Sequence, residues 1–409
     1  MSVLRKRLVD LAILDGEPAM PVKFHVGSPN IGNRSRLMER ILDVLDRRWL
    51  TNGGVYVREF EQRIAEMAGV RHCVAMCNGT VALEIAIRAM GLDGEVILPS
   101  FTFVATAHAL RLQGITPVFC DIDPQTHNID PTRVELLITP RTSAILGVHV
   151  WGRPCDVESL EEIARRRRLG LLFDAAHAFG CSHKGRPIGS FGDAEVYSFH
   201  ATKFVNACEG GAIVTNNPDL AARMELMRNF GFAGYDCVTC LGTNGKMNEF
   251  SAAMGLTSLD SIDEFIEANR RNYEQYRDEL ADVPGLEVVS YDENDRNNYQ
   301  YLAVEVDETR LELSRDDLVH ILHQENVMAR RYFHPGCHRM EPYRSEFPHV
   351  HLRLPHTEAL TRRVMCLPTG TNVTAEAIST ICGILRLAVT HQRKLRRFLD
   401  ERNGLASVG

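Results

Sequence analysis

One lysine lies in surroundings that could make its amine reactive. Lys203 ends the segment Tyr197-Ser-Phe-His-Ala-Thr-Lys203, which is apolar or small in character and is followed by Glu209-Gly-Gly. A lysine near apolar walls loses its proton more easily and can act as a nucleophilic amine. A surface location explains such a lysine poorly, so we predict that Lys203 is a reactive group.

An acid and a histidine follow a neighbouring apolar run. Asp174 ends the run Leu171-Leu-Phe-Asp174, and His177 comes three residues later. A carboxylate that ends a buried strand is costly unless a partner or a cation meets it. The carboxyl ends of parallel strands are also where ligands bind in open α/β sheets. We therefore expect Asp174 to lie at a ligand site.

Two further features could hold a flat, phosphorylated ligand. Cys77-Asn-Gly79-Thr80 leads directly into a helical pattern, so free N–H groups and a closely approaching glycine could cradle a phosphate. Pro99-Ser-Phe-Thr-Phe103 ends another predicted strand, where an aromatic ring could either pack in the core or stack on a planar cofactor. Each feature alone is explained equally well by an ordinary structural role, such as core packing or a turn that leads into a helix. The four together, in strand order, predict a site for pyridoxal 5′-phosphate (PLP).

The elements that must position these residues alternate between strand and helix. Continuous Val/Ile/Leu runs predict strands buried on both faces of a sheet, at 95–98, 117–120, 143–150, 169–173, 194–199 and 211–215. The intervening helices, such as 81–90 and 156–168, indicate an α/β domain with a mostly parallel sheet.

The pattern changes near residue 260, inside a long amphipathic helix over 247–282 that we expect to break near Ser261. We predict a large domain over 20–260 and a smaller C-terminal α+β domain over 261–400, with 20–60 as a segment able to pack on the smaller one. Its expected strands begin at 285 and 298, and its helices cover 314–325, 357–364 and 374–396.

Composition excludes several classes of protein. The 409 residues carry 46 Lys+Arg against 53 Asp+Glu, a net charge of −7, which disfavours nucleic acid as a partner. There is no apolar stretch of about 18 residues, and acidic residues follow the basic start too soon for a signal peptide, so we expect no membrane association and a cytoplasmic location. The eleven cysteines are scattered, and neither Cys237-Val-Thr-Cys240 nor His334-Pro-Gly-Cys337-His338 completes a redox or zinc motif, so we expect no metal.

Over nearly its whole length the chain resembles the DegT/DnrJ/EryC1/StrS sugar aminotransferases, a fold-type I PLP family. The matching motifs are Trp49-Leu-Thr-Asn-Gly-Gly, Asn78-Gly-Thr, Pro99-Ser-Phe-Thr-Phe, Asp174-Ala-Ala-His, Ser198-Phe-His-Ala-Thr-Lys and Gly242-Thr-Asn-Gly-Lys-Met-Asn-Glu. More narrowly it resembles the dTDP-4-keto-6-deoxyglucose 4-aminotransferases of antibiotic deoxysugar pathways, of the desosamine and calicheamicin type. Asn-Asn-Tyr-Gln-Tyr and Pro-Gly-Cys-His also recur there.

The resemblance implies a role for each matching residue. Lys203 forms the Schiff base with PLP, Asp174 pairs with the pyridine nitrogen, and His177 lies near O3′, where relatives often carry Gln. Phe103 stacks on the ring. The phosphate is held by the backbone of Gly79 and Thr80 and by the Ser198 hydroxyl, and Asn244 reaches the phosphate of a partner subunit, which implies a homodimer with shared sites. Lys246 departs from the family's usual Arg, which leaves its contacts open.

The implied reaction takes an amino group from L-glutamate to C4 of dTDP-4-keto-6-deoxy-D-glucose and gives dTDP-4-amino-4,6-dideoxy-D-glucose. The alternatives are a C3 aminotransferase or a dehydrase on a related nucleotide keto sugar; dehydrases of the family replace the lysine with His, and Lys203 is present. A non-catalytic binding protein would be expected to lose Asp174 or Lys203, and no GxGxxG supports a nicotinamide enzyme. Substrate-binding candidates are Thr51, Asn52, His200, Tyr332, His334 and His338, with loop or core packing an equal alternative for the last two.

Overall fold

A computed structural model describes residues 6–406. Its centre is a seven-stranded sheet in the order β2-β10-β9-β6-β5-β3-β4, and only β10 runs antiparallel to its two neighbours. The strands are β2 (His72–Met76), β3 (Glu95–Pro99), β4 (Thr116–Cys120), β5 (Thr142–Val148), β6 (Gly170–Asp174), β9 (Ala194–Ser198) and β10 (Gly211–Thr215). The predicted runs thus became strands, and the expected α/β fold with a mostly parallel sheet is confirmed.

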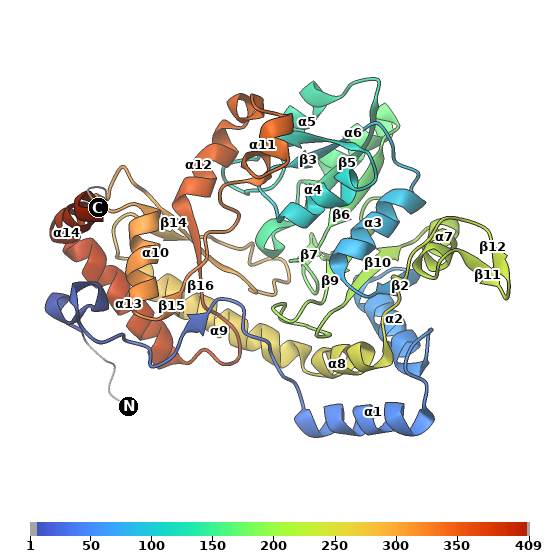
Figure 1. The fold of residues 1–409 in the computed structure, drawn as a ribbon, viewed down its shortest axis with the longest axis horizontal. Coiled ribbons are helices and arrows are strands. Elements are labelled where there is room, and N and C mark those ends of the chain that lie inside the picture. The colour runs from blue at the N-terminus through green and yellow to red at the C-terminus, as the bar shows by residue number, and fades with distance from the viewer. Residues whose placement is uncertain (1–5, 407–409) are drawn as a thin grey trace.

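Helices cover both faces of this sheet (Figure 1). Two separate apolar clusters form, one on each face, because side chains of a strand alternate between the faces. The covering helices are α2 (Val55–Ala68), α3 (Gly79–Ala89), α4 (Val104–Arg111), α5 (Pro131–Leu137), α6 (Val157–Arg167), α7 (Pro218–Arg228) and α8 (Glu249–Asp260).

A second module lies on the left of Figure 1 around a three-stranded antiparallel sheet. It has its own apolar cluster, to which Leu11 and Ile13 of the N-terminal segment contribute. Its elements are β13 (Leu286–Val288), β14 (Leu302–Val306), β16 (Val364–Leu367), α9 (Ile262–Leu280), α10 (Arg315–Gln324), α12 (Pro355–Arg363), α13 (Ala375–Thr390) and α14 (Gln392–Ala406). Ser261 separates α8 from α9, where the break was expected. The domain division at 260 stays a prediction.

The segment over 20–60 contacts both the second module and the helices of the large sheet. β1 (Phe24–His25) pairs with β15 (Val327–Met328) of the second module. α1 (Arg34–Arg47) instead runs beside α8 along the lower edge of Figure 1, where Arg40 donates to the Thr257 hydroxyl at 2.9 Å.

Two shorter segments lie away from the module cores. α11 (Tyr343–Glu346) packs on α4 through a stacked His108–Tyr343 pair and on β4 through an edge-on Phe119–Tyr343 pair. A small hairpin of β11 (Phe232–Gly234) and β12 (Cys237–Val238) projects at the right edge of Figure 1. None of the helices over 6–406 is both long and apolar enough to cross a membrane.

Candidate active site

The site lies at the carboxyl edge of the large sheet, where several parallel strands end together. Asp174 is the last residue of β6, Ser198 ends β9, and Lys203 follows in the connection to β10. This arrangement follows from the parallel topology, because parallel strands bring their carboxyl ends to one edge.

Lys203 is a half-buried amine with a displaced acid–base equilibrium. Its Nζ donates to the Tyr301 hydroxyl at 3.1 Å and lies 5.6 Å from the centre of that ring. Removal from water lowers the pKa of Lys203 to about 8, although attraction to Asp174 opposes the shift. A lysine in this state has a much larger neutral fraction near physiological pH than an ordinary surface lysine.

Asp174 is buried and accepts two hydrogen bonds. The Thr106 hydroxyl donates to Oδ2 at 2.8 Å, and the Ala176 N–H donates to Oδ1 at 3.1 Å. Burial raises the pKa of Asp174 from its ordinary value despite these donors. A cationic ligand group beside the carboxylate would offset this cost, since an opposite charge favours the ionised form.

His177 is buried in a neutral form. Burial, with a smaller contribution from the charge of Lys203, lowers its pKa well below the usual value. The main-chain N–H of Trp151 donates to its Nδ1 at 3.3 Å, so the hydrogen-bond network assigns the ring proton to Nε2. His177 therefore has an N–H to donate, as the amide of a glutamine would.

The proposed phosphate cradle has the close packing that its glycines predict. Asn78 caps α3 by accepting from the Val81 N–H at 2.9 Å, and Gly79 is the first helical residue. A Cβ on Gly79 would lie 3.1 Å from the Cβ of Ser198, and one on Gly211 would lie 2.6 Å from the Asn78 carbonyl oxygen. The start of α3, with Thr80, is thus held against the last residue of β9 and the first residue of β10.

The aromatic segment after β3 has one buried and one exposed phenylalanine. Phe101 is fully buried and packs edge-on against Trp151 and Phe333. Phe103 precedes α4 and is 58% exposed, which is high for a ring of this size. Phe101 therefore belongs to the core, and Phe103 remains the candidate for stacking.

The expected substrate residues lie in different surroundings. Thr51 and Asn52 are exposed in the turn before α2, and His200 is exposed with its Nδ1 2.9 Å from the Thr202 hydroxyl. Tyr332 is half-buried and packs edge-on against Tyr301, 5.9 Å between ring centres, which places it near Lys203.

The two loop histidines differ sharply. His334 is exposed, with Nδ1 3.3 Å from the Thr361 carbonyl oxygen. His338 is buried, and both ring nitrogens have partners within the fold: the Ser100 hydroxyl at 2.7 Å and the Glu358 carboxylate at 2.6 Å. The structure favours the packing alternative for His338, and we leave it out of the proposed substrate set.

Asn244 is exposed on a loop fixed to the large sheet. The Cys77 N–H donates to the Gly245 carbonyl at 2.8 Å, which anchors the loop beside the start of α3. Lys246, whose contacts the sequence left open, donates to the Asn229 side chain at 2.9 Å and lies 4.7 Å from the centre of the Phe230 ring.

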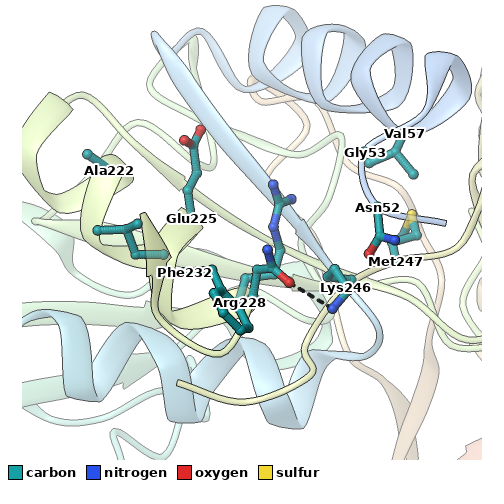
Figure 2. Close-up of a pocket in the computed structure, with 11 residues that line it drawn as sticks. Asn52, Gly53, Val57, Ala222, Glu225, Arg228, Phe232, Lys246 and Met247 are labelled. Atoms are coloured by element: carbon teal, nitrogen blue, oxygen red, sulfur yellow. Dashed lines mark hydrogen bonds between the residues drawn. The ribbon is translucent and has the colours of Figure 1, made fainter. Parts of the chain in front are cut away.

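A pocket of about 460 Å³ opens beside this loop (Figure 2). The cationic side chains of Arg228 and Lys246 contribute to it from one side and the turn before α2 from another. It is lined by Asn52, Gly53, Val57, Ala222, Glu225, Leu226, Arg228, Asn229, Phe232, Lys246 and Met247. Asn52 is the sequence-predicted substrate residue in this wall.

Three site residues were not identified from sequence: Thr106, Trp151 and Tyr301. Trp151 directly follows a predicted strand, a position that could have marked it, whereas Thr106 lies inside α4. Tyr301 lies in Asn-Asn-Tyr-Gln-Tyr, which was noted only as a shared motif.

Comparisons with known proteins place the chain in one enzyme family. The DegT/DnrJ/EryC1/StrS aminotransferase family matches residues 33–386. A dTDP-4-amino-4,6-dideoxy-D-glucose transaminase of Shigella dysenteriae is 36% identical over 367 residues, 90% of this chain and 99% of the relative. A GDP-perosamine synthase of Caulobacter vibrioides is 36% identical over 331 residues, 78% of this chain and 87% of the relative.

Solved structures extend the likeness to the fold. The crystal structure of DesI, determined in the presence of its TDP-sugar product, is 53% identical with a TM-score of 0.91, covering 95% of this chain and 98% of DesI. S. venezuelae DesV in complex with a ketimine intermediate is 30% identical with a TM-score of 0.81, covering 87% of this chain and 95% of DesV. The resemblance seen in the motifs is confirmed. The chain belongs to the DegT/DnrJ/EryC1/StrS aminotransferase family.

Proposed function

We propose that this chain is a PLP-dependent aminotransferase that moves an amino group from L-glutamate to C4 of dTDP-4-keto-6-deoxy-D-glucose. The product is dTDP-4-amino-4,6-dideoxy-D-glucose, a precursor for amino deoxysugars such as those of antibiotics. The observation that carries the proposal is the half-buried Lys203, with its pKa lowered to about 8, in the same site as the buried Asp174 and His177.

The residues present fit PLP in four respects. Lys203 offers an amine with a lowered pKa for covalent attachment. Asp174 is a buried carboxyl group whose ionised form a cationic ligand group would stabilise. At Gly79 the start of α3 lies so close to β9 that a side chain would crowd Ser198. Because glycine has no side chain, the backbone N–H groups at this helix start can bind a phosphate. Phe103 presents an exposed ring.

Each side chain then has a definite task. When bound, PLP supplies an electron sink for the carbon that loses a proton. Asp174 would keep the pyridine nitrogen protonated, because its negative charge favours the cation. His177 would donate from Nε2, and Lys203, once its amine is free and neutral, can take up and return the proton at Nζ.

The choice of sugar nucleotide rests on relatives. The similar DesI was crystallised with its TDP-sugar product, and two curated relatives are named for dTDP-4-amino-4,6-dideoxy-D-glucose. Thr51, Asn52, His200, Tyr332 and His334 are the side chains that we assign to this substrate. Since a GDP-perosamine synthase is also similar, the test must include other nucleotides.

A homodimer with shared sites is part of the proposal. Met38, Leu42 and Leu45 are exposed on α1 at helical spacing, and Trp49 and Leu50 extend this apolar stripe. An exposed apolar face of this kind is typical of a protein–protein contact. Asn244 is exposed as well, and we propose that it completes the phosphate site of the partner subunit.

The test is amine transfer with a matched lysine control. The purified protein with PLP and L-glutamate is offered dTDP- and GDP-linked 4-keto and 3-keto sugars, and products are identified by mass. We expect an amino sugar from dTDP-4-keto-6-deoxy-D-glucose, none from Lys203→Ala, and normal turnover from Lys184→Ala, which removes an exposed lysine paired with Glu158. Full turnover by Lys203→Ala would refute the proposal.

A further inference from the structure

Trp151 lies in a conformation that its surroundings must enforce. Its side chain is fully buried, and its backbone has φ 63° and ψ 3°, in the left-handed region. A bulky residue rarely adopts this conformation, and such residues cluster at functional sites. In this conformation the Trp151 main-chain N–H donates to Nδ1 of His177.

The Trp151 side chain also stacks in the site. Its ring lies nearly parallel to Phe333 and His177, with ring centres 5.6 Å and 6.3 Å away. Trp151 therefore contacts His177 twice, through its stacked indole and through the main-chain N–H that fixes the position of the His177 proton. A shift of the indole would disturb both contacts.

The indole is tied to one buried histidine. Trp151 Nε1 donates to His127 Nδ1 at 3.1 Å, and His127 Nε2 lies 2.9 Å from Oε1 of Glu305. An indole N–H can only donate, so Nδ1 must accept, and the His127 proton must lie on Nε2, facing the carboxylate. Glu305 thus fixes His127 in the tautomer that Trp151 requires.

Glu305 comes from the other module. It lies on β14, and its Oε2 is 2.6 Å from Nε of Arg363, which follows on α12. Although burial opposes it, the His127 hydrogen bond and the charge of Arg363 lower the pKa of Glu305, so it stays a carboxylate. The chain of contacts therefore runs from the small sheet to the edge of the site.

We propose that His127 is a positioning residue: it holds the Trp151 indole, and Trp151 in turn holds His177 with its Nε2–H free for the cofactor. The proposal rests on the proposed function for its effect on rate. It assigns no contact between His127 and substrate or cofactor.

Three substitutions separate the two hydrogen bonds of His127. In His127→Asn the side-chain oxygen takes the place of Nδ1, so the bond from Trp151 can persist; asparagine also tolerates the positive φ of 64° at this position. In His127→Gln the amide nitrogen takes the place of Nε2, so the bond to Glu305 persists and the Trp151 acceptor is lost. His127→Leu removes both.

The first readout needs no cofactor. The chain has two tryptophans, so an ¹⁵N-indole spectrum of the apoenzyme gives one signal from Trp151, whose N–H donates to His127, and one from Trp49, which serves as the internal control. Trp49→Phe assigns the two. We expect the Trp151 signal to shift and lose protection in His127→Leu and His127→Gln and to keep its protection in His127→Asn, while the Trp49 signal stays in place.

The second readout is the half-reaction of the PLP-loaded enzyme with L-glutamate. We expect it to slow about tenfold in His127→Leu and His127→Gln and to stay within about threefold in His127→Asn, as loss of positioning predicts. An unchanged Trp151 signal in His127→Leu would overturn the contact. Equal slowing of His127→Asn and His127→Leu, or no slowing in any variant, would overturn the positioning role. The indole signal decides the contact even if the proposed function fails.

Discussion

The amine of Lys203 and the hydroxyl of Tyr301 are 3.1 Å apart, although the two residues belong to different modules. The contact connects the loop after β9 to the segment before β14. It keeps the amine at the carboxyl edge of the sheet, beside the buried acid of β6, and its surroundings hold the Lys203 pKa at about 8.

The rate at which the apoenzyme takes up PLP should follow this pKa. Below about pH 8 the Lys203 amine is mostly protonated and cannot attack; above it the neutral amine dominates, so the uptake rate should rise with pH and level off. Stopped-flow absorbance measures the rate. In Asp174→Asn the midpoint should move to lower pH, because the negative charge that supports the ammonium is gone. A midpoint near the ordinary lysine value of about 10.4 would contradict this account.

Gly79→Ala should weaken PLP binding about tenfold by crowding the cradle. The added Cβ would meet Ser198 at 3.1 Å and push the start of α3 away from β9. Equilibrium dialysis of the apoenzyme measures the affinity. Gly383→Ala is the matched control, because its Cβ would enter open space on α13 and should leave PLP affinity unchanged. Equal affinities in all three proteins would rule out a cradle at this point.

The two loop histidines should respond differently to truncation. His334→Ala should raise the KM for the dTDP-sugar severalfold while the glutamate half-reaction, which does not involve the nucleotide, keeps its rate. His338→Ala should lower the free energy of unfolding by about 1–3 kcal/mol, because it leaves the Ser100 and Glu358 side chains without their buried partner. Steady-state kinetics and urea denaturation separate the two effects. A fall in both half-reactions of His334→Ala would show that this loop supports the site and does not bind the sugar nucleotide.

Mixed dimers should test the placement of Asn244. Lys203→Ala and Asn244→Asp subunits are each expected to be inactive, but a heterodimer of the two would contain one site with both groups intact if Asn244 acts across the interface. Activity should then recover on mixing, up to about a quarter of the wild-type value for random pairing at equal amounts. No recovery, with heterodimers verified by mass, would place Asn244 in the site of its own chain.

Much of the fold could be predicted because the large sheet is buried on both faces. Its strands are continuous apolar runs, so they stand out from the amphipathic helices between them, and Ser261 did break the long helix. The β11–β12 hairpin was not predicted, since its short exposed strands bury no repeating apolar face. The antiparallel direction of β10 was not predicted, because a run buried on both faces carries no mark of its direction.

The site residues that could be predicted from the sequence are those whose position next to an apolar strand indicates their role. Lys203, Asp174 and His177 each end or follow an apolar strand, a position that sequence reveals. Trp151, His127 and Glu305 could not be linked this way, because their hydrogen bonds join loops and strands that are far apart in the chain. The burial of His338 likewise depends on Glu358 and Ser100, which only the fold brings together.

Amine transfer to C4 is tested most directly by following the nitrogen atom itself. The PLP-loaded enzyme is incubated with ¹⁵N-labelled L-glutamate and dTDP-4-keto-6-deoxy-D-glucose, and the sugar product is analysed by NMR. We expect a labelled amine bonded to C4. Label at C3, or a dehydrated sugar without label, would contradict it.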